Sequence, residues 1–96
     1  MAQRIEGKVV SVDAAGNLMT DITAEKLELA PSDDTVTICC DEHETTGIYT
    51  TDHSQPEMTF IAVIGESGHL QLTIVGESAH LMLGIRVGED VVVAWT

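Results

Sequence analysis

Hydrophobic positions along the chain mostly alternate with polar ones, and no segment longer than about two turns keeps a helical period. The alternation is clearest in residues 69–75, where Leu70, Leu72 and Ile74 share one face. Residues 58–64 are apolar on both faces, as a central strand is. Glycine-containing turns separate such runs, so the pattern predicts a mostly β fold. The predicted strands are 7–12, 18–22, 35–40, 48–51, 58–64, 69–75 and 90–95.

The same alternation assigns inward positions in two of the other strands. In the strands predicted at 7–12 and 35–40, these positions are Val10, Val12, Val36, Ile38 and Cys40. Cys39 and Cys40 are neighbours on an extended strand and therefore point to opposite faces, so they cannot bridge each other without strain. The chain has no other cysteine, which indicates a reducing compartment.

Two short helical segments are predicted between the strands. Thr23 is a candidate N-cap for a helix over residues 24–30. Ser78 is a candidate N-cap for one turn over 79–83, and Gly84 is placed to end that turn in the left-handed conformation.

The connections complete the predicted topology. Residues 14–17 form a tight turn, because Gly16 and Asn17 tolerate positive φ, and the acidic residues 41–44 form a loop. The prediction is therefore an all-β fold of about six or seven short strands with one or two single-turn helices. Such a count suits a small barrel or a sandwich.

Length and charge exclude several classes of protein. The 96 residues suit a single domain, spanning 1–96, with little room for a deep cleft. Sixteen carboxylates against four strong bases give a net charge of −12, which disfavours nucleic acid and anionic membranes as partners. A hydrophobic content of 44% and a mean hydropathy of +0.15 are too apolar for a disordered acidic chain. Neither a membrane-spanning apolar run nor an N-terminal signal segment is evident, so we expect a cytoplasmic protein.

The residues best suited to metal or nucleophilic chemistry are few. The run from Cys39 to Glu44 holds two thiols, three carboxylates and an imidazole, but no second ligand pair exists elsewhere in the sequence to complete a zinc site. We interpret this run as a buried cysteine followed by a solvated acidic loop. His69 lies two residues from Ser67, yet no acid is spaced to orient the imidazole, so we expect no metal site and no catalytic residue.

Two segments carry motifs that recur in a known family. Residues 10–22 contain the D-x-x-G-N-x-x-T pattern, and residues 60–93 contain S-G-x-L, G-x-S-A and L-G-x-x-x-G phrases. In this order the motifs resemble the C-terminal β-barrel domain of the S-adenosylmethionine hydroxide adenosyltransferases, the family that includes the fluorinating enzymes. The residues that carry the resemblance are Asp13, Gly16, Asn17, Leu18, Thr20, Ile22, Ser67, Gly68, Leu70, Gly76, Ser78, Ala79, Leu83, Gly84, Gly88 and Val91.

The resemblance implies a small closed Greek-key β-barrel that, in the family, follows a larger N-terminal α/β domain. Family members bind S-adenosylmethionine at a subunit boundary, where the barrel contacts the adenine. Because this sequence does not contain the α/β domain, the resemblance implies a chain that does not catalyse the family's reaction by itself. S-adenosylmethionine or adenosine is the candidate ligand.

The family's adenine-contacting positions carry over to five residues. They are Asn17, Ser67, Gly68, Ile74 and Gly76. The asparagine amide can both donate to and accept from an adenine edge. Ala15 stands where the family has an aromatic residue that packs on the purine, and Thr51 stands near a family tyrosine.

These features predict a stand-alone, non-catalytic barrel that acts as an oligomerising, adenosyl-binding or partner-binding module. We expect a homo-oligomer, with a trimer as the candidate assembly, formed through the outward positions Val9, Val75 and Val92. One alternative is one component of a two-chain adenosyltransferase, completed by a separate α/β protein. Another is a PDZ-like peptide-binding module, because residues 76–92 also resemble the end of a PDZ domain.

Overall fold

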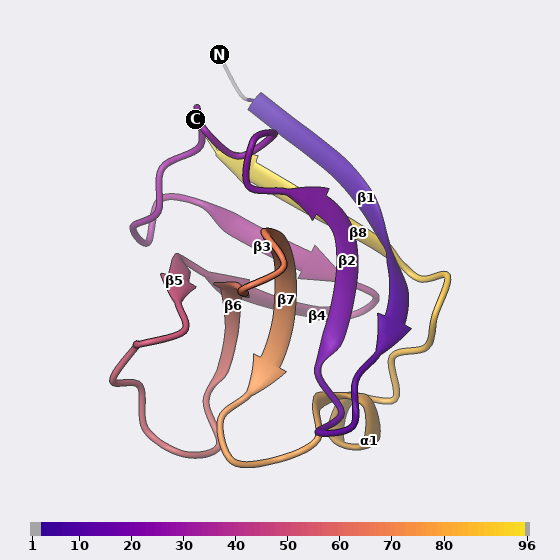
Figure 1. Cartoon of the computed structure of the whole chain (residues 1–96). Coiled ribbons are helices and arrows are strands. Elements are labelled where there is room, and N and C mark those ends of the chain that lie inside the picture. Colours follow the sequence, from indigo (N-terminus) through magenta and orange to yellow (C-terminus); the bar gives the residue numbers. More distant parts are fainter. Residues whose placement is uncertain (1–2, 96) are drawn as a thin grey trace.

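The computed structural model describes residues 3–95, and eight strands in this range form one sheet (Figure 1). The order across the sheet is β4-β3-β8-β1-β2-β7-β6-β5. The elements are β1 (Gln3–Val12), β2 (Leu18–Thr23), β3 (Thr37–Cys40), β4 (His43–Thr46), β5 (Ile48–Thr50), β6 (Phe60–Ile64), β7 (His69–Ile74), α1 (Ala79–Leu83) and β8 (Asp90–Trp95).

The sheet curls until its first and last strands lie near each other. Only Gly47 separates β4 from β5, and the Thr45 hydroxyl donates to the Phe60 carbonyl on β6, 2.8 Å away. Neighbouring strands are antiparallel except β5 and β6, which are parallel. The β2–β3 and β7–β8 connections each pass over two intervening strands, as in a Greek key. The predicted all-β Greek-key barrel is confirmed, with one or two more strands than expected and a nearly closed sheet.

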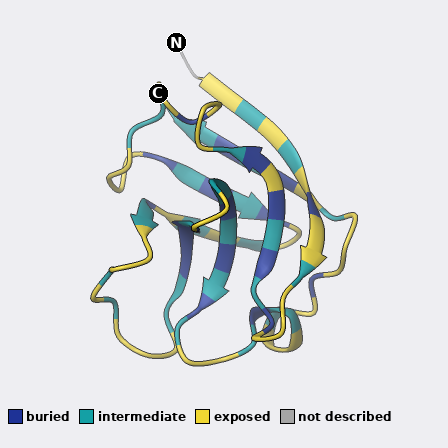
Figure 2. Ribbon diagram, viewed as in Figure 1, coloured by how far each residue is buried: buried dark blue, intermediate teal, exposed yellow. Residues whose placement is uncertain are grey.

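The core lies inside this curled sheet, because the period-two pattern turns the apolar side chains inward. Buried residues alternate with less buried ones along β7 (Figure 2). The inward set predicted for β7 is buried, and so are Val36, Ile38 and Cys40. Ile61, Ala62 and Val63 on β6 are all buried, which confirms the prediction of a strand that is covered on both faces. The cap predictions for α1 are also confirmed, because Ser78 Oγ accepts from the Leu81 N–H and Gly84 has a φ of 70°.

The facing predicted for β1 is wrong at two positions. Val9, expected on the outside, is 1% exposed, and Val10, expected inside, is 52% exposed. The pairing of β1 with β2 shifts by one residue between Val9 and Ser11, so the strand carries a β-bulge there. The extra residue lets Val9 and Val12 both face the core, although simple alternation would separate them.

The acidic loop predicted at 41–44 is shorter than expected. Only Asp41 and Glu42 form the turn, with Asp41 at a φ of 55°, and His43 and Glu44 already pair with β3. The β4 side chains are half-buried or exposed, so this edge strand carries no apolar alternation that would reveal it.

The helix predicted at 24–30 is instead a run of turns. The backbone N–H groups of Lys26, Leu27, Glu28 and Ala30 donate to the carbonyl three residues earlier, so no α-helical bond forms. Thr23 does cap this run, because its Oγ1 accepts from the Lys26 N–H at 3.4 Å. Only Leu27 is buried among these residues, and one anchor does not stabilise an α-helical turn.

The two ends of the barrel differ in what covers them. In Figure 1 the start of β1 and the end of β8 lie at one end, and α1 lies at the other, beside the β1–β2 turn. The backbone N–H of His80 donates to the Gly16 carbonyl at 2.9 Å, which attaches α1 to that turn. Within residues 3–95, no helix has the length and apolar character needed to cross a membrane.

Candidate functional site

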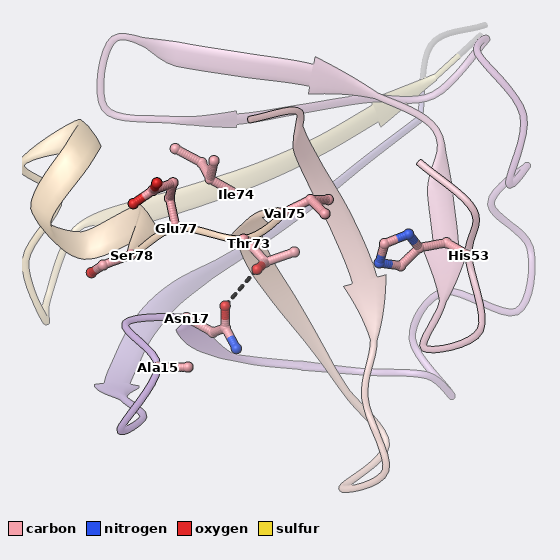
Figure 3. A pocket seen from close by; sticks show the side chains of 9 residues that line it. Ala15, Asn17, His53, Thr73, Ile74, Val75, Glu77 and Ser78 are labelled. Carbon is pink, nitrogen blue, oxygen red and sulfur yellow. Dashed lines mark hydrogen bonds between the residues drawn. The ribbon is translucent and has the colours of Figure 1, made fainter. Parts of the chain in front are cut away.

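A pocket of about 420 Å³ opens at the end of the barrel that carries α1 (Figure 3). Its walls come from the β1–β2 turn, the loop after β5, the end of β7 and the residues that lead into α1. The lining residues are Ala15, Asn17, His53, Thr73, Ile74, Val75, Gly76, Glu77 and Ser78.

The β1–β2 turn is held by one carboxylate, that of Asp13. Its Oδ1 accepts from the backbone N–H groups of Ala15 and Asn17, both at 2.9 Å, and its Oδ2 accepts from Asn17 Nδ2 at 3.0 Å. Gly16, with a φ of 87°, lets the chain turn sharply between these donors. The local sequence thus folds into a turn that presents Asn17 to the pocket.

The Asn17 side chain is held on both sides. The Thr73 hydroxyl on β7 donates to Asn17 Oδ1 (Figure 3). On the other side, Asn17 Nδ2 donates to Asp13 Oδ2. A carboxamide has two donor hydrogens and two acceptor lone pairs, so one of each remains after these two bonds. The amide is therefore fixed in orientation and still able to pair with a group that offers one donor and one acceptor.

His53 is a pocket residue that the sequence did not single out. It comes from the loop after β5, and its ring lies across the pocket from Asn17 in Figure 3. Its Nδ1 accepts from the Gln55 N–H at 3.2 Å, which leaves the proton of a neutral imidazole on Nε2. The Tyr49 ring meets it edge-on, with centroids 6.5 Å apart. The pocket therefore contains a flat ring although Ala15 provides none.

Comparison with protein families decides what this barrel is. Residues 7–92 match the model of the SAM hydroxide adenosyltransferase C-terminal domain. The chain belongs to this family. No curated protein matches the chain. The PDZ resemblance, in contrast, extends only over residues 76–92.

Solved structures share the fold of this SAM hydroxide adenosyltransferase C-terminal domain. An uncharacterized conserved protein from Thermotoga maritima matches with a TM-score of 0.76 and 19% identity, over 94% of this chain and 35% of that chain. A conserved hypothetical protein from Thermus thermophilus matches with a TM-score of 0.68 and 22% identity, over 92% of this chain and 34% of that chain. The chain spans about a third of the length of either protein.

The five positions taken from the adenosyltransferase family fall at two separate places. Asn17, Ile74 and Gly76 line the pocket, where the Ile74 side chain is buried and so its backbone is the part that a ligand can reach. Ser67 and Gly68 lie in the turn before β7, about 20 Å along the strand from Ile74. There the Gly68 carbonyl accepts from the Ala24 N–H. A contact of Ser67 and Gly68 with an adenosyl group stays a prediction.

The pocket of this family member has a negative electrostatic character. Glu77 is the charged residue in its lining, and the lining includes no lysine or arginine. Burial alone would raise the pKa of Asp13, but the hydrogen bonds from Asn17, Ala15 and Gly16 lower it below its ordinary value. Because that pKa is lower folded than unfolded, the ionised carboxylate stabilises the turn above the unfolded pKa. This stabilisation is lost as pH falls through the folded pKa.

The cysteines lie on β3 at the other side of the barrel. Cys40 is buried, and burial, followed by the charges of Glu89, Asp41 and Asp90, raises its pKa to about 11. Cys39 Sγ lies 3.5 Å from Glu44 Oε2, and burial and this carboxylate raise the Cys39 pKa. Within residues 3–95, no three His, Cys, Asp or Glu side chains gather as metal ligands.

Proposed function

We propose that this domain is a non-catalytic module that binds the adenine end of adenosine or S-adenosylmethionine in the pocket beside Asn17, as a homo-oligomer. The observation that carries the proposal is the Asn17 amide, which is oriented by Asp13 and Thr73 and retains one donor and one acceptor. An adenine edge presents an amino donor next to a ring-nitrogen acceptor, and asparagine pairs with that arrangement through two hydrogen bonds.

The other walls of the pocket support a purine. The His53 ring offers a flat surface on which a base can stack. It could take the role of the family's aromatic residue, because this chain has Ala15 at that position. Base stacking on such a ring contributes about 1–3 kcal/mol, similar to one bidentate asparagine contact.

Charge selects among adenosyl ligands. Glu77 lines the pocket, and the whole chain carries a net charge of −12, so a ligand with phosphate groups is repelled. Adenosine is neutral and S-adenosylmethionine carries a positive sulfonium, so both are compatible with this field. We therefore propose nucleosides and sulfonium nucleosides as ligands and not nucleotides.

The catalytic groups of an adenosyltransferase lie outside this proposal. Both hydroxyl groups in the pocket lining have structural partners, because Ser78 Oγ caps α1 and the Thr73 hydroxyl donates to Asn17 Oδ1. No nucleophile paired with a base is among the lining residues. The pocket is open to solvent on one side, so a second protein surface can complete it. An α/β partner with the family's catalytic groups fits this role, and its identification by co-purification tests the two-component alternative.

Calorimetric titration with adenosine tests the pocket. We expect adenosine and S-adenosylmethionine to bind and AMP to bind at least about tenfold more weakly, because Glu77 repels the phosphate. Asn17→Ala should weaken the binding of adenosine by roughly 5–150-fold, which corresponds to about 1–3 kcal/mol of binding free energy. His53→Ala should do so to a similar extent, while His53→Phe, which keeps a ring, should retain most of the affinity.

A matched control removes a small polar side chain elsewhere. Thr46→Ala on the exposed edge of β4 should leave adenosine binding unchanged. The His53 variants leave the Asp13 turn intact, so they keep the test decisive if Asn17→Ala unfolds the turn. Absence of heat at millimolar adenosine, or AMP binding as tightly as adenosine, contradicts the proposal.

Assembly of the domain has its own candidate surface. The exposed apolar side chains of α1 and the following loop are Leu81, Met82 and Val87, with exposed fractions of 80%, 52% and 58%. Of the three positions predicted for the contact, Val9 is buried and is therefore excluded, whereas Val75 and Val92 are half-buried. We propose the more exposed side chains of α1 and its following loop as the contact. Burying such side chains drives association while carboxylates stay at the rim.

Light scattering after size exclusion measures the assembly. We expect a mass of three times the 10.3 kDa chain. Leu81→Asp should shift the protein to a monomer, because it places a charge in the contact. Leu29→Asp, at an exposed apolar position in the turns after β2, at the end of the barrel opposite α1, should keep the trimer. A wild-type monomer at high concentration refutes the assembly.

A further inference from the structure

A second pocket, of about 450 Å³, lies at the end of the barrel opposite α1. It forms where the start of β1 pairs with the end of β8, Gln3 facing Trp95, and where the turns after β2 cross that end. The lining residues are Gln3, Arg4, Ile5, Lys26, Leu29 and Trp95. β1 spans ten residues, so the two pockets lie about 30 Å apart along it.

The charge of this pocket is opposite to that of the chain. Two of the four strong bases, Arg4 and Lys26, line it, and none of the 16 carboxylates does. Arg4 contacts Glu6 at 3.1 Å in an exposed pair, which leaves most of its guanidinium donors unused. Lys26 makes no salt bridge within the described part of the chain. This pocket is therefore a local site that attracts an anion, on a protein whose net charge is −12.

The same pocket has an apolar wall. Trp95 and Ile5 are half-buried and pack against the core, so their exposed faces are held in place. Leu29 is 90% exposed at the pocket, more than any other large apolar side chain described. A ligand that covers Leu29 and the Trp95 ring would remove apolar surface from water.

We propose that this pocket binds a small organic carboxylate that carries an apolar body. The carboxylate takes the place between the Arg4 guanidinium, which can pair with it through two parallel hydrogen bonds, and the Lys26 ammonium. The apolar body lies on Trp95 and under Leu29. The pocket volume falls in the range of sites for small organic ligands.

Trp95 is the only tryptophan, so its fluorescence reports this pocket directly. The probes are phenylpropionate, the neutral phenylpropanamide and the cationic phenylpropylamine, which share one apolar body. At an ionic strength of about 0.01 M, where charges are little screened, we expect a saturable change with phenylpropionate. Phenylpropanamide, which loses both ion pairs, should bind roughly 4–25-fold more weakly, and phenylpropylamine should produce no saturable change.

Charge variants separate a local site from a general charge effect. Lys26→Gln and Arg4→Gln should each weaken phenylpropionate by about 2–5-fold, the range of a single exposed ion pair. Arg86→Gln removes the same charge from an exposed position outside the pocket and should have no effect. Leu29→Ser should weaken the acid and the amide equally, because it removes apolar contact only.

Three results would overturn the proposal. They are equal binding of acid and amide, equal weakening by Arg86→Gln and Lys26→Gln, and displacement of phenylpropionate by inorganic phosphate at equal concentration. Adenosine affinity measured on the same Lys26→Gln protein should be unchanged, so failure of this site and failure of the Asn17 pocket are distinguishable.

Discussion

We expect the Gly16→Ala variant to lose roughly 2–5 kcal/mol of its free energy of unfolding and to lose adenosine binding with it. Gly16 has a φ of 87°, where a side chain is strained by about 1–2 kcal/mol. A Cβ at this position would also lie 1.9 Å from Ser78 Oγ and 2.8 Å from the Ser78 Cα. The second contact is with backbone, so no side-chain rotation relieves it.

The clash would separate the two segments that build the pocket. Gly16 accepts from the His80 N–H, so the turn and α1 move apart if the Ser78 backbone shifts. Asn17 follows Gly16 directly and Ser78 lines the same pocket. Adenosine affinity should therefore fall even in solution conditions where the variant stays folded.

Urea unfolding provides the measurement, and Gly84→Ala provides the control. Gly84 also has positive φ, 70°, but a Cβ there meets nothing within 4 Å. The Gly84→Ala variant should lose only the part of the free energy of unfolding that backbone strain accounts for, about 1–2 kcal/mol, and it should keep adenosine binding. If the midpoints of Gly16→Ala and Gly84→Ala fall equally at an unchanged m value, the backbone clash has no role in stability.

Thr20→Val should destabilise the barrel by roughly 2–4 kcal/mol although it preserves side-chain volume. Thr20 is 1% exposed, and its hydroxyl donates to the Leu70 carbonyl at 2.7 Å and accepts from the Ile22 N–H at 3.2 Å. Residues 20–22 of β2 lie opposite Leu70 alone, because the β2–β7 pairing shifts between Met19 and Thr23. The hydroxyl thus connects two backbone groups at an irregularity inside the core.

Replacement by serine separates the hydroxyl from the rest of the side chain. Thr20→Ser keeps both hydrogen bonds and removes one buried methyl, so it should lose only about 1 kcal/mol. The comparison uses urea unfolding of the three proteins. A Thr20→Val protein as stable as Thr20→Ser would mean that other partners satisfy Leu70 and Ile22 in the variant.

Local sequence signals predicted the regular parts of the fold correctly. Alternation in residues 69–75 placed Leu70, Leu72 and Ile74 in the core, and the Ser78 and Gly84 signals located both ends of α1. These features depend on the backbone geometry of a few consecutive residues. Such short-range physics is readable without knowledge of the partner strands.

The errors occur where a neighbouring strand overrides the local pattern. The bulge between Val9 and Ser11 exchanges the faces of Val9 and Val10, because the register with β2 determines the facing. His43 and Glu44 become part of an edge strand through pairing with β3, not through their own propensity. Residues 24–30 stay as turns because only Leu27 is anchored.

The candidate site divides in the same way. The motif around Asp13 and Asn17 could be read from the chain, because the carboxylate bonds to residues within four positions. His53 could not, since only the fold brings the loop after β5 to the end of β7. The fold likewise separates Ser67 from Ile74 by the length of β7, although the family resemblance had assigned both residues to the adenine contact.

By itself, the sequence determined the all-β class, the core face of most strands, the caps of α1, the turn that carries Asn17 and the resemblance to the family. Each of these follows from the spacing of residue types or from local hydrogen bonds. The tertiary structure alone decided the β1 bulge, the existence of β4 and the meeting of His53 with Asn17 in a negative pocket. It also decided that Arg4, Lys26 and Trp95 share a positive pocket at the other end. The reason is that strand register and Greek-key crossings bring together residues tens of positions apart, and no local pattern encodes those contacts.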